Sequence, residues 1–383
     1  MDLLPTADQE AVVASASEFL AKEMPISALR ARAGEAEAFD RTSWQRAARL
    51  GWFGLGLPEE QGGVGYTAAE EALLFREIGR HLAPGPFVAT VLGAHLAAAA
   101  GRSDLVDAIT SGEIVVGTAQ RRTGARAAAG PDTSGGLDVV SGDFDLIDTA
   151  GAALVAVVEP HGAALLEAAA FGTPRPLPPI DPGIRLATAS IHRQPALVTV
   201  GRDREPAFLR GSVLVAALHT GIAEAARDLA VEHAKNRVQF GRPIGVNQAV
   251  KHRCADMAVR AEAARAQLLF AALALAEDRP DAEFHAAAAR TVGAQAAIVN
   301  AAENIQIHGG MGYTHEHDAQ LYAKRARVLE QLLASPRETL HLISGLPAAA
   351  VRAEATEPAA SAASTSSAET AHPSAQHPAG AAR

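Results

Sequence analysis

Two glycine-containing segments carry the residues whose types and spacing could do chemistry. The first, RVQFGRPIGVNQ, interrupts a helical pattern between Arg237 and Gln248. A tight connector between two helices accounts for its glycines and its proline. It does not account for Arg237, Phe240 and Gln248. A guanidinium beside free backbone N–H groups suits a phosphate or a heterocycle, so ligand binding is the alternative interpretation.

The second segment, QIHGGMGYTHEHD, runs from Gln306 to Asp318. A helix ends here at the pair Gly309–Gly310, and glycines permit close approach of a ligand to the backbone. A C-cap followed by a loop is the plainer interpretation, but a C-cap needs one glycine and this segment contains three. Both interpretations stay open from these residues alone.

The His-Glu-His-Asp run at 315–318 could suggest a metal site. It lacks the i, i+4 spacing of a helical zinc pair, so we expect Asp318 to be a helix N-cap or first-turn acid instead.

Other residues have similarly plain interpretations. We expect a buried thiol at Cys254, core packing by Trp52 and Phe53, and a solvated loop, rather than a coenzyme A phosphate site, for three arginines: Arg121, Arg122 and Arg126.

The elements that must position the two segments follow from periodicity. Residues 1–111 are predicted as a helical domain, with a Gly-rich loop at 62–65. Residues 112–203 contain short β-prone runs separated by turn residues and are predicted as a small β-barrel domain. Residues 204–348 are predicted as a four-helix bundle, with helices at 207–237, 246–277, 281–307 and 318–334. The fold class is therefore α+β, mainly α, and the low-complexity tail at 349–383 is predicted to be disordered.

Composition excludes several classes of function. The 383 residues carry a net charge of −9, which argues against a nucleic-acid surface. The N-terminus is acidic and lacks the apolar run of a signal peptide, and no stretch approaches the ~20 apolar residues of a membrane span. The single cysteine excludes an internal disulfide and agrees with a cytoplasmic location. These features predict a protein of the cytoplasm without nucleic-acid or membrane partners.

Three stretches together resemble the acyl-CoA dehydrogenase family of flavoenzymes. RVQFGRPIGVNQAVKHRCADM is similar to the family's Arg-x-x-Phe-Gly turn and the helix after it, and QIHGGMGYTHEHDAQLYAKRA is similar to its Gln-x-x-Gly-Gly-x-Gly segment. LGWFGLGLPEEQGGVGYTAAEEALLFREIGR resembles its Pro-Glu-x-x-Gly-Gly loop. The matches lie in order, and the resemblance covers about residues 6–345.

The resemblance implies an enzyme that binds FAD and oxidises an acyl-CoA thioester to the α,β-enoyl-CoA. A carboxylate removes the α-proton, the β-hydrogen leaves as hydride to the flavin, and an electron-transfer flavoprotein accepts the electrons. The flavin of this family lies at a subunit interface. The residues implied to hold a neighbour's FAD are Arg237, Phe240, Gln248, Gln306, Ile307, His308, Gly309 and Gly310.

The family's catalytic glutamate has no counterpart at either of its usual places. By ungapped counting, one place falls at about Leu333 and the other at about Gly211 and Ser212. The nearest carboxylates are Glu330 and Glu205, and proton abstraction from a weakly acidic carbon needs a positioned base. The catalytic residue of this chain is therefore unknown from the sequence.

The β region also departs from the family. A Thr-Glu-x-x-x-Gly-Ser stretch and a Trp-Ile-Thr strand usually enclose the flavin ring, whereas this chain has GTAQRRTGARAAAG and GDFDLIDTAGAALVAVV. The β-region segments implied to enclose the chain's own flavin ring therefore depart from the family pattern. The two glycine-containing segments implied to hold a neighbour's flavin match it. This asymmetry resembles one subunit of the unlike-subunit α2β2 enzymes of actinobacterial sterol side-chain degradation.

Three hypotheses follow from these features. The first is a subunit of a heteromeric dehydrogenase whose partner chain supplies the base, with steroid-CoA thioesters as candidate substrates. The second is a self-sufficient homo-oligomer with a displaced carboxylate, Glu205 or Glu330. The third is a flavin-free relative that acts as a scaffold.

Overall fold

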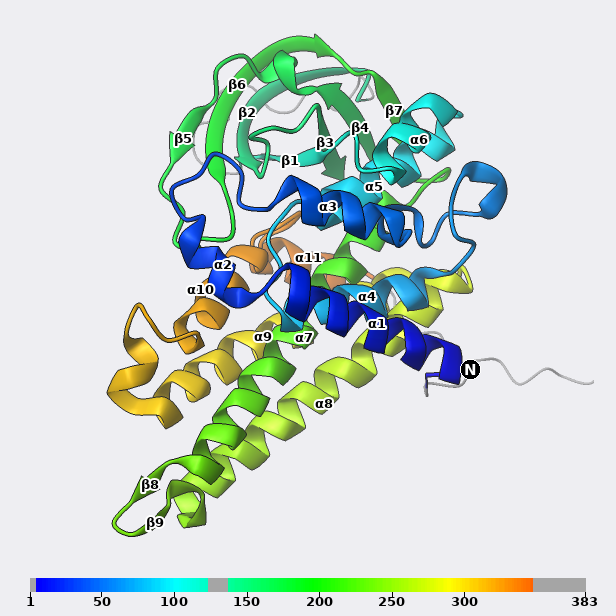
Figure 1. The fold of residues 1–383 in the computed structure, drawn as a ribbon. Helices are drawn as coiled ribbons and strands as arrows, with labels where there is room; N and C mark the ends of the chain where they lie inside the picture. The colour runs from blue at the N-terminus through cyan, green and yellow to red at the C-terminus, as the bar shows by residue number, and fades with distance from the viewer. Residues whose placement is uncertain (1–4, 123–136, 347–383) are drawn as a thin grey trace, which may run out of the picture. The chain divides into compact units, whose positions relative to one another are not determined.

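The order of elements along the chain is helices, strands and then helices again (Figure 1). The structure, a computed structural model, describes residues 5–122 and 137–346. It is mainly helical with a sheet in the middle of the sequence, so the predicted fold class is confirmed. No helix of the described ranges is long and apolar enough to cross a membrane. The predicted disordered tail and Arg126 lie outside the described residues.

The N-terminal helices surround an aromatic core. Thr6 and Thr67 both begin helices with reciprocal capping boxes, in which the side chain three residues later bonds back to the cap. Trp52 and Phe53 are buried as predicted. The rings of Trp44 and Phe53 lie 4.4 Å apart. The helices are α1 (Ala7–Glu23), α2 (Ile26–Ala31), α3 (Arg41–Arg49), α4 (Ala68–Arg80), α5 (Phe87–Ala99) and α6 (Ser103–Thr110).

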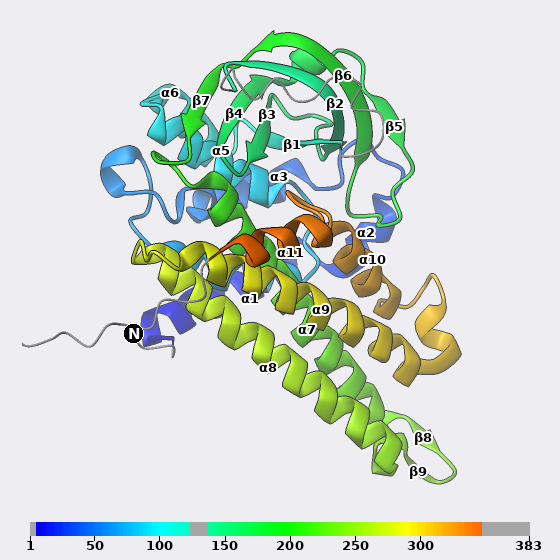
Figure 2. The same cartoon turned by 180° about the vertical axis from the view of Figure 1, so that it is seen from behind.

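The middle region forms one seven-stranded, strongly curved sheet (Figures 1 and 2). Its strand order is β5-β6-β2-β1-β3-β4-β7, with β1 parallel to β3 and antiparallel to β2. The strands are β1 (Val116–Arg121), β2 (Val139–Ile147), β3 (Leu154–Glu159), β4 (Gly162–Glu167), β5 (Arg175–Leu177), β6 (Leu186–Pro195) and β7 (Val198–Gly201).

Both faces of the central strands are buried, but against different partners. In β3, Leu154, Ala156 and Val158 pack with the helices, whereas Val155 and Val157 pack within the β region itself. Successive strand side chains point to opposite faces, which separates these two cores. Because both faces are covered, β3 has no alternation of apolar and polar residues in its sequence.

Some strands differ from the predicted runs. LDVVSG and FDLID, predicted separately, belong to one strand, β2, with an irregular register between Val140 and Gly142. Gly142 has a φ of +135°, which allows this irregularity. Strands β4, β5 and β6 were not among the predicted runs. Their sequences are rich in alanine or contain proline, and neither feature favours a strand.

The C-terminal region contains the long helices. They are α7 (Ala207–Asn236), α8 (Gln248–Ala276), α9 (Ala282–His308), α10 (Ala319–Leu329) and α11 (Pro336–Gly345). The last predicted helix, 318–334, ends at Leu329 instead, and α11 was not predicted. Ser335 starts α11 with a capping box to Glu338, and Pro336 occupies its first turn.

Helices α4 and α7 touch through their backbones. A Cβ atom on Gly79 would lie 2.2 Å from the Leu218 carbonyl oxygen. A Cβ atom on Gly221 would lie 1.9 Å from the Arg76 carbonyl oxygen. Glycine at these two positions therefore permits a helix spacing that no other residue allows.

Candidate functional site

The first candidate segment is a small hairpin at the far end of α7 and α8 (Figures 1 and 2). Strands β8 (Val238–Gln239) and β9 (Arg242–Pro243) pair across a two-residue turn. Phe240 and Gly241 form this turn with φ values of +54° and +77°, the left-handed pair that a tight hairpin needs. A bulky residue is strained in this conformation, so Phe240 is a candidate for a role that needs its side chain.

The hairpin side chains have few partners within the chain. Phe240 has a relative exposure of 101%. Arg237, the C-cap of α7, is exposed, and among the described residues its guanidinium forms no ion pair. Gln248, the first residue of α8, is exposed too. These groups are free to meet a ligand or another chain, although their binding role stays a prediction.

The second segment begins where α9 ends. Gln306, Gly309 and Gly310 are exposed, whereas the Ile307 side chain is buried. A Cβ atom on Gly310 would meet no atom within 4 Å, and its φ is not in the left-handed region. Neither crowding nor backbone conformation within this chain therefore requires glycine at this position.

The structure brings these two segments together at one end of the bundle. The imidazole of His308 lies 4.0 Å from that of His233, one turn before Arg237, and 4.4 Å from that of His317. Ile307 shares a small apolar cluster with Ile244 of the connector. Burial, helped by His308 and Arg237, lowers the pKa of His233. Burial also lowers the pKa of His308.

Two predictions about neighbouring residues are confirmed only in part. Asp318 stands at the N-cap position of α10, but its side chain does not cap the helix. It pairs with Arg30 instead, at 2.7 Å. Cys254 is half-buried rather than fully buried, and desolvation raises the pKa of its thiol. Neither residue contributes a reactive group to the bundle end.

The two predicted arginines of the described loop region are paired rather than simply solvated. Arg121 lies at the end of β1, where it bonds Glu159 at 2.9 Å. Arg122 pairs with Asp145 at 3.2 Å. Their charges are therefore already partly compensated by carboxylates of the same sheet.

The two places that ungapped counting predicts for the family's base meet in space. A Cβ atom on Gly211 would lie 2.5 Å from a Leu333 methyl group and 3.0 Å from one of Leu92. The Ser212 hydroxyl donates to the Phe208 carbonyl within its own helix, at 2.8 Å. This space is therefore filled by leucine side chains and offers no carboxylate.

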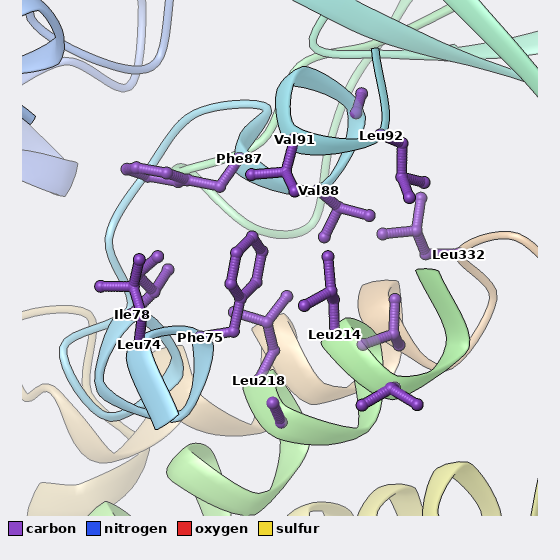
Figure 3. Close-up of a cluster of buried hydrophobic side chains, with 14 of the residues drawn as sticks. Leu74, Phe75, Ile78, Phe87, Val88, Val91, Leu92, Leu214, Leu218 and Leu332 are labelled. Carbon is purple, nitrogen blue, oxygen red and sulfur yellow. The ribbon is translucent and has the colours of Figure 1, made fainter. Parts of the chain in front are cut away.

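The space beside these leucines is also apolar and packed (Figure 3). A cavity of about 50 Å³ remains there, bounded by Thr118, Asp148 and Arg325 on its polar side. A volume of that size holds water molecules rather than a tricyclic ring. The side chains in Figure 3 come from α4, α5, α7 and the loop after α10: Leu74, Phe75, Ile78, Phe87, Val88, Val91, Leu92, Leu214, Leu218 and Leu332.

Polar residues fix the loop that carries Leu333. Arg290 is buried and donates to the carbonyls of Glu330, Leu332 and Ala334. Burial lowers the pKa of Arg290 to about 10. Gln120 accepts from the Leu333 N–H at 3.0 Å and holds that residue at a φ of +68°. The sequence carries no local signal for these contacts, because Gln120 and Arg290 lie far from the loop along the chain.

The two candidate replacement bases are both engaged elsewhere. Glu205 accepts from Arg210 at 3.0 Å and lies 3.8 Å from His95 in a buried network. Burial raises the pKa of Glu71, the second carboxylate of this network, but Arg210 and His95 outweigh it and lower that pKa to about 2. Glu330 pairs with Arg327 at 3.2 Å.

The polar side of the small cavity contains a second buried network. Arg325 pairs with Asp181 through a bidentate contact, and both are buried. Burial raises the pKa of the Asp148 carboxyl to about 6, although it accepts the Arg185 N–H at 2.7 Å. Asp148 directly follows β2, in the region predicted to correspond to the family's Trp-Ile-Thr strand. The residues that face this cavity therefore do not fit a flavin ring of the chain's own.

Comparison with known proteins identifies relatives along most of the chain. The family model "Acyl-CoA dehydrogenase, N-terminal domain" matches residues 6–108, and "Acyl-CoA dehydrogenase, C-terminal domain" matches residues 205–332. Acyl-CoA dehydrogenase IpdE2 of Mycobacterium tuberculosis is 35% identical over 339 residues, which cover 88% of this chain and 96% of that protein.

Solved structures agree with this assignment. A chain of the ChsE4-ChsE5 complex from Mycobacterium tuberculosis has a TM-score of 0.79 at 23% identity, covering 91% of this chain and 100% of that chain. A variant of the Tcur3481-Tcur3483 steroid ACAD has a TM-score of 0.78 at 25% identity, covering 88% and 96%. The N-terminal helices, curved sheet and C-terminal bundle, together with these matches, show that the chain belongs to the acyl-CoA dehydrogenase family of flavin-dependent oxidoreductases.

Proposed function

We propose that this chain is one subunit of a heteromeric, FAD-dependent acyl-CoA dehydrogenase that forms α,β-enoyl-CoA thioesters in the cytoplasm. A second, different chain supplies the catalytic base and the pocket for the flavin ring. The present chain supplies the end of its bundle to the shared FAD. An electron-transfer flavoprotein is the proposed acceptor of the electrons.

One contrast carries this proposal. The bundle end presents an exposed Phe240, an exposed Gly310 and an Arg237 that forms no ion pair with the described residues, whereas leucines occupy the space for a base at Gly211 and Leu333. A subunit that acted alone would need both a bundle end that binds FAD and a base beside Gly211 and Leu333. A subunit that completes another chain's site needs only the bundle end.

Each exposed group has a chemical task in this arrangement. Arg237 is the counter-charge for the FAD diphosphate, since a guanidinium matches phosphate oxygens with paired N–H donors. Phe240 is placed to stack on the adenine, and Gln248 and Gln306 offer amides beside it. Gly309 and Gly310 allow close approach of the backbone. Ile307 and His308 contribute their peptide groups, because the Ile307 side chain is buried and the His308 ring packs against His233 and His317. Bound FAD would supply the hydride acceptor.

The relatives support the finer parts of the proposal. The ChsE4-ChsE5 and Tcur3481-Tcur3483 proteins are named as pairs of chains, and the second pair is named as a steroid ACAD. By analogy we propose α2β2 assembly and a bulky steroid-type acyl-CoA as the substrate class. The homo-oligomeric alternative is less favoured, because Glu205 and Glu330 are both held in ion pairs.

The composition of the native assembly tests the proposal. The tagged full-length chain is isolated from its own cells, and native mass spectrometry and the visible spectrum give its partners and its FAD content. We expect two kinds of chain in equal number and one FAD for each pair. An assembly of this chain alone, with one FAD per chain and turnover of acyl-CoA, would establish the homo-oligomer instead. A flavin-free assembly would establish the scaffold.

A further inference from the structure

The β region contains a cleft that the proposed function does not use. Its volume is about 480 Å³, within the range of roughly 300–1,000 Å³ that small-molecule sites span. The cleft opens to the surface of the β region, and its size suits a small-molecule ligand.

The floor of the cleft is apolar and belongs to the core of the β region. Leu146, Val155 and Phe171 form it, each with a relative exposure of 3% or less. Ala187 lies opposite Leu146 in the pairing of β2 with β6, and Ala168 follows β4. Both alanines line the cleft, so their small side chains leave the space open.

The opening of the cleft is polar, and the N–H groups of its arginine are directed to main-chain carbonyls. Arg185 donates its Nε–H to the Glu35 carbonyl at 2.8 Å and a terminal N–H to the Arg32 carbonyl at 2.6 Å. The Glu35 carboxylate pairs with Arg32 at 2.7 Å. Thr149, which is half-buried, also lines the cleft. An anion would have to compete with main-chain carbonyls for the Arg185 N–H groups, and a cation would be repelled by the guanidinium, so charged ligands are disfavoured.

We infer that this cleft binds an uncharged, compact and largely apolar molecule, with a hydroxyl or carbonyl group directed to Thr149. The site is separate from the proposed FAD contacts at the bundle end. It is also separate from the small cavity beside the leucines. Strand β2 and the turn after it divide the two spaces: Leu146 and Thr149 line the cleft, whereas Ile147 and Asp148 line the small cavity.

A neutral apolar fluorophore, N-phenyl-1-naphthylamine, tests the inference on the full-length chain. We expect saturable fluorescence enhancement with one site per chain. Ala187→Phe should fill the cleft and weaken binding at least tenfold. Ala189→Phe is the matched control, because Ala189 lies on the same face of β6 but does not line the cleft. Circular dichroism and thermal unfolding establish that each variant is folded.

A second variant keeps the test decisive if Ala187→Phe does not fold. Ala168→Phe narrows the cleft from η3 (Ala168–Phe171) and should weaken the probe similarly. Binding that is unchanged in a folded Ala187→Phe or Ala168→Phe chain would overturn the inference. So would the absence of saturable binding in the unmodified chain, or an equal loss in Ala189→Phe.

Discussion

The bundle end and the centre of the molecule, the region around Gly211 and Leu333, differ in the way that an active site shared between two chains would require. At the bundle end, Phe240 is strained and exposed, and Arg237 is exposed and forms no ion pair within residues 5–122 and 137–346. At the centre, Leu333 and Leu92 close the space that a base would occupy, and Arg290 holds the closing loop in place. Under the proposed function, the difference teaches that one fold can contribute to a neighbour's site while its own is closed.

The largest expected effect comes from restoring a carboxylate to the closed centre. Gly211→Glu should lower the free energy of unfolding by roughly 3–5 kcal/mol, because it buries an unpaired charge among leucines. Urea denaturation measures the loss. Gly34→Glu is the control, since a Cβ atom on Gly34 meets nothing within 4 Å.

A double-mutant cycle sharpens the same prediction. Leu333→Ala should make room beside Gly211→Glu and recover part of the lost stability, so the two effects should not add. Strict additivity would show that the two residues do not compete for the same space.

The centre should also be sensitive to acid. Burial lowers the pKa of His219 to about 4, from 6.5. The unfolded chain then binds more protons than the folded one, so stability is full above pH 6.5 and is lost as the pH falls towards 4. The difference of 2.5 pH units corresponds to about 3 kcal/mol.

Urea titrations at pH 7 and pH 4.5 measure this loss. His219→Leu should remove part of the acid sensitivity, whereas the exposed His341→Leu should leave it unchanged. An unaltered pH dependence in His219→Leu would assign the sensitivity to other groups.

At the bundle end, Arg237→Ala should affect FAD and not folding. Loss of a charge-assisted phosphate contact costs roughly 1.5–3 kcal/mol, or about 10- to 150-fold in FAD affinity of the native assembly. Fluorescence titration of the flavin measures it, with the exposed Arg49→Ala as control. Unchanged affinity would remove the role proposed for Arg237.

A smaller free-energy change is expected for Phe240→Gly, and it should have opposite signs for folding of the isolated chain and for association with the partner. Relief of the left-handed strain should stabilise the isolated chain by about 1 kcal/mol, while loss of the ring should weaken association with the partner. Asp278→Gly relieves a similar conformation, with a φ of +47°, and should leave association unchanged. Equal effects of both variants on association would contradict the role of Phe240.

Local signals predicted much of the bundle end. The glycines, the helix boundaries near Arg237 and Gln248, and the end of α9 near His308 could be predicted because each depends on neighbouring residues. The capping boxes at Thr6 and Thr67 also depend only on residues that are close in the sequence. Asp318 was harder to predict, because Arg30, its partner, is 288 positions away.

The closed centre could be predicted only in part. The sequence shows that Gly211 and Leu333 are not carboxylates, but not that they touch. Strands such as β4 were missed because Ala163 and Ala164 are buried on opposite faces, which removes the alternating pattern. The cleft of the β region depends on alanines from separate elements and has no counterpart in any local pattern.

The paired glycines of α4 and α7 restrict how the molecule can respond to a partner. Gly79 packs directly against the backbone of Leu218, and Gly221 packs against that of Arg76, so the two helices are held in one register. Sliding one along the other would drive Cβ atoms of neighbouring residues into main-chain oxygens. Docking should therefore occur between preformed bodies, with adjustment confined to the hairpin at the far tip.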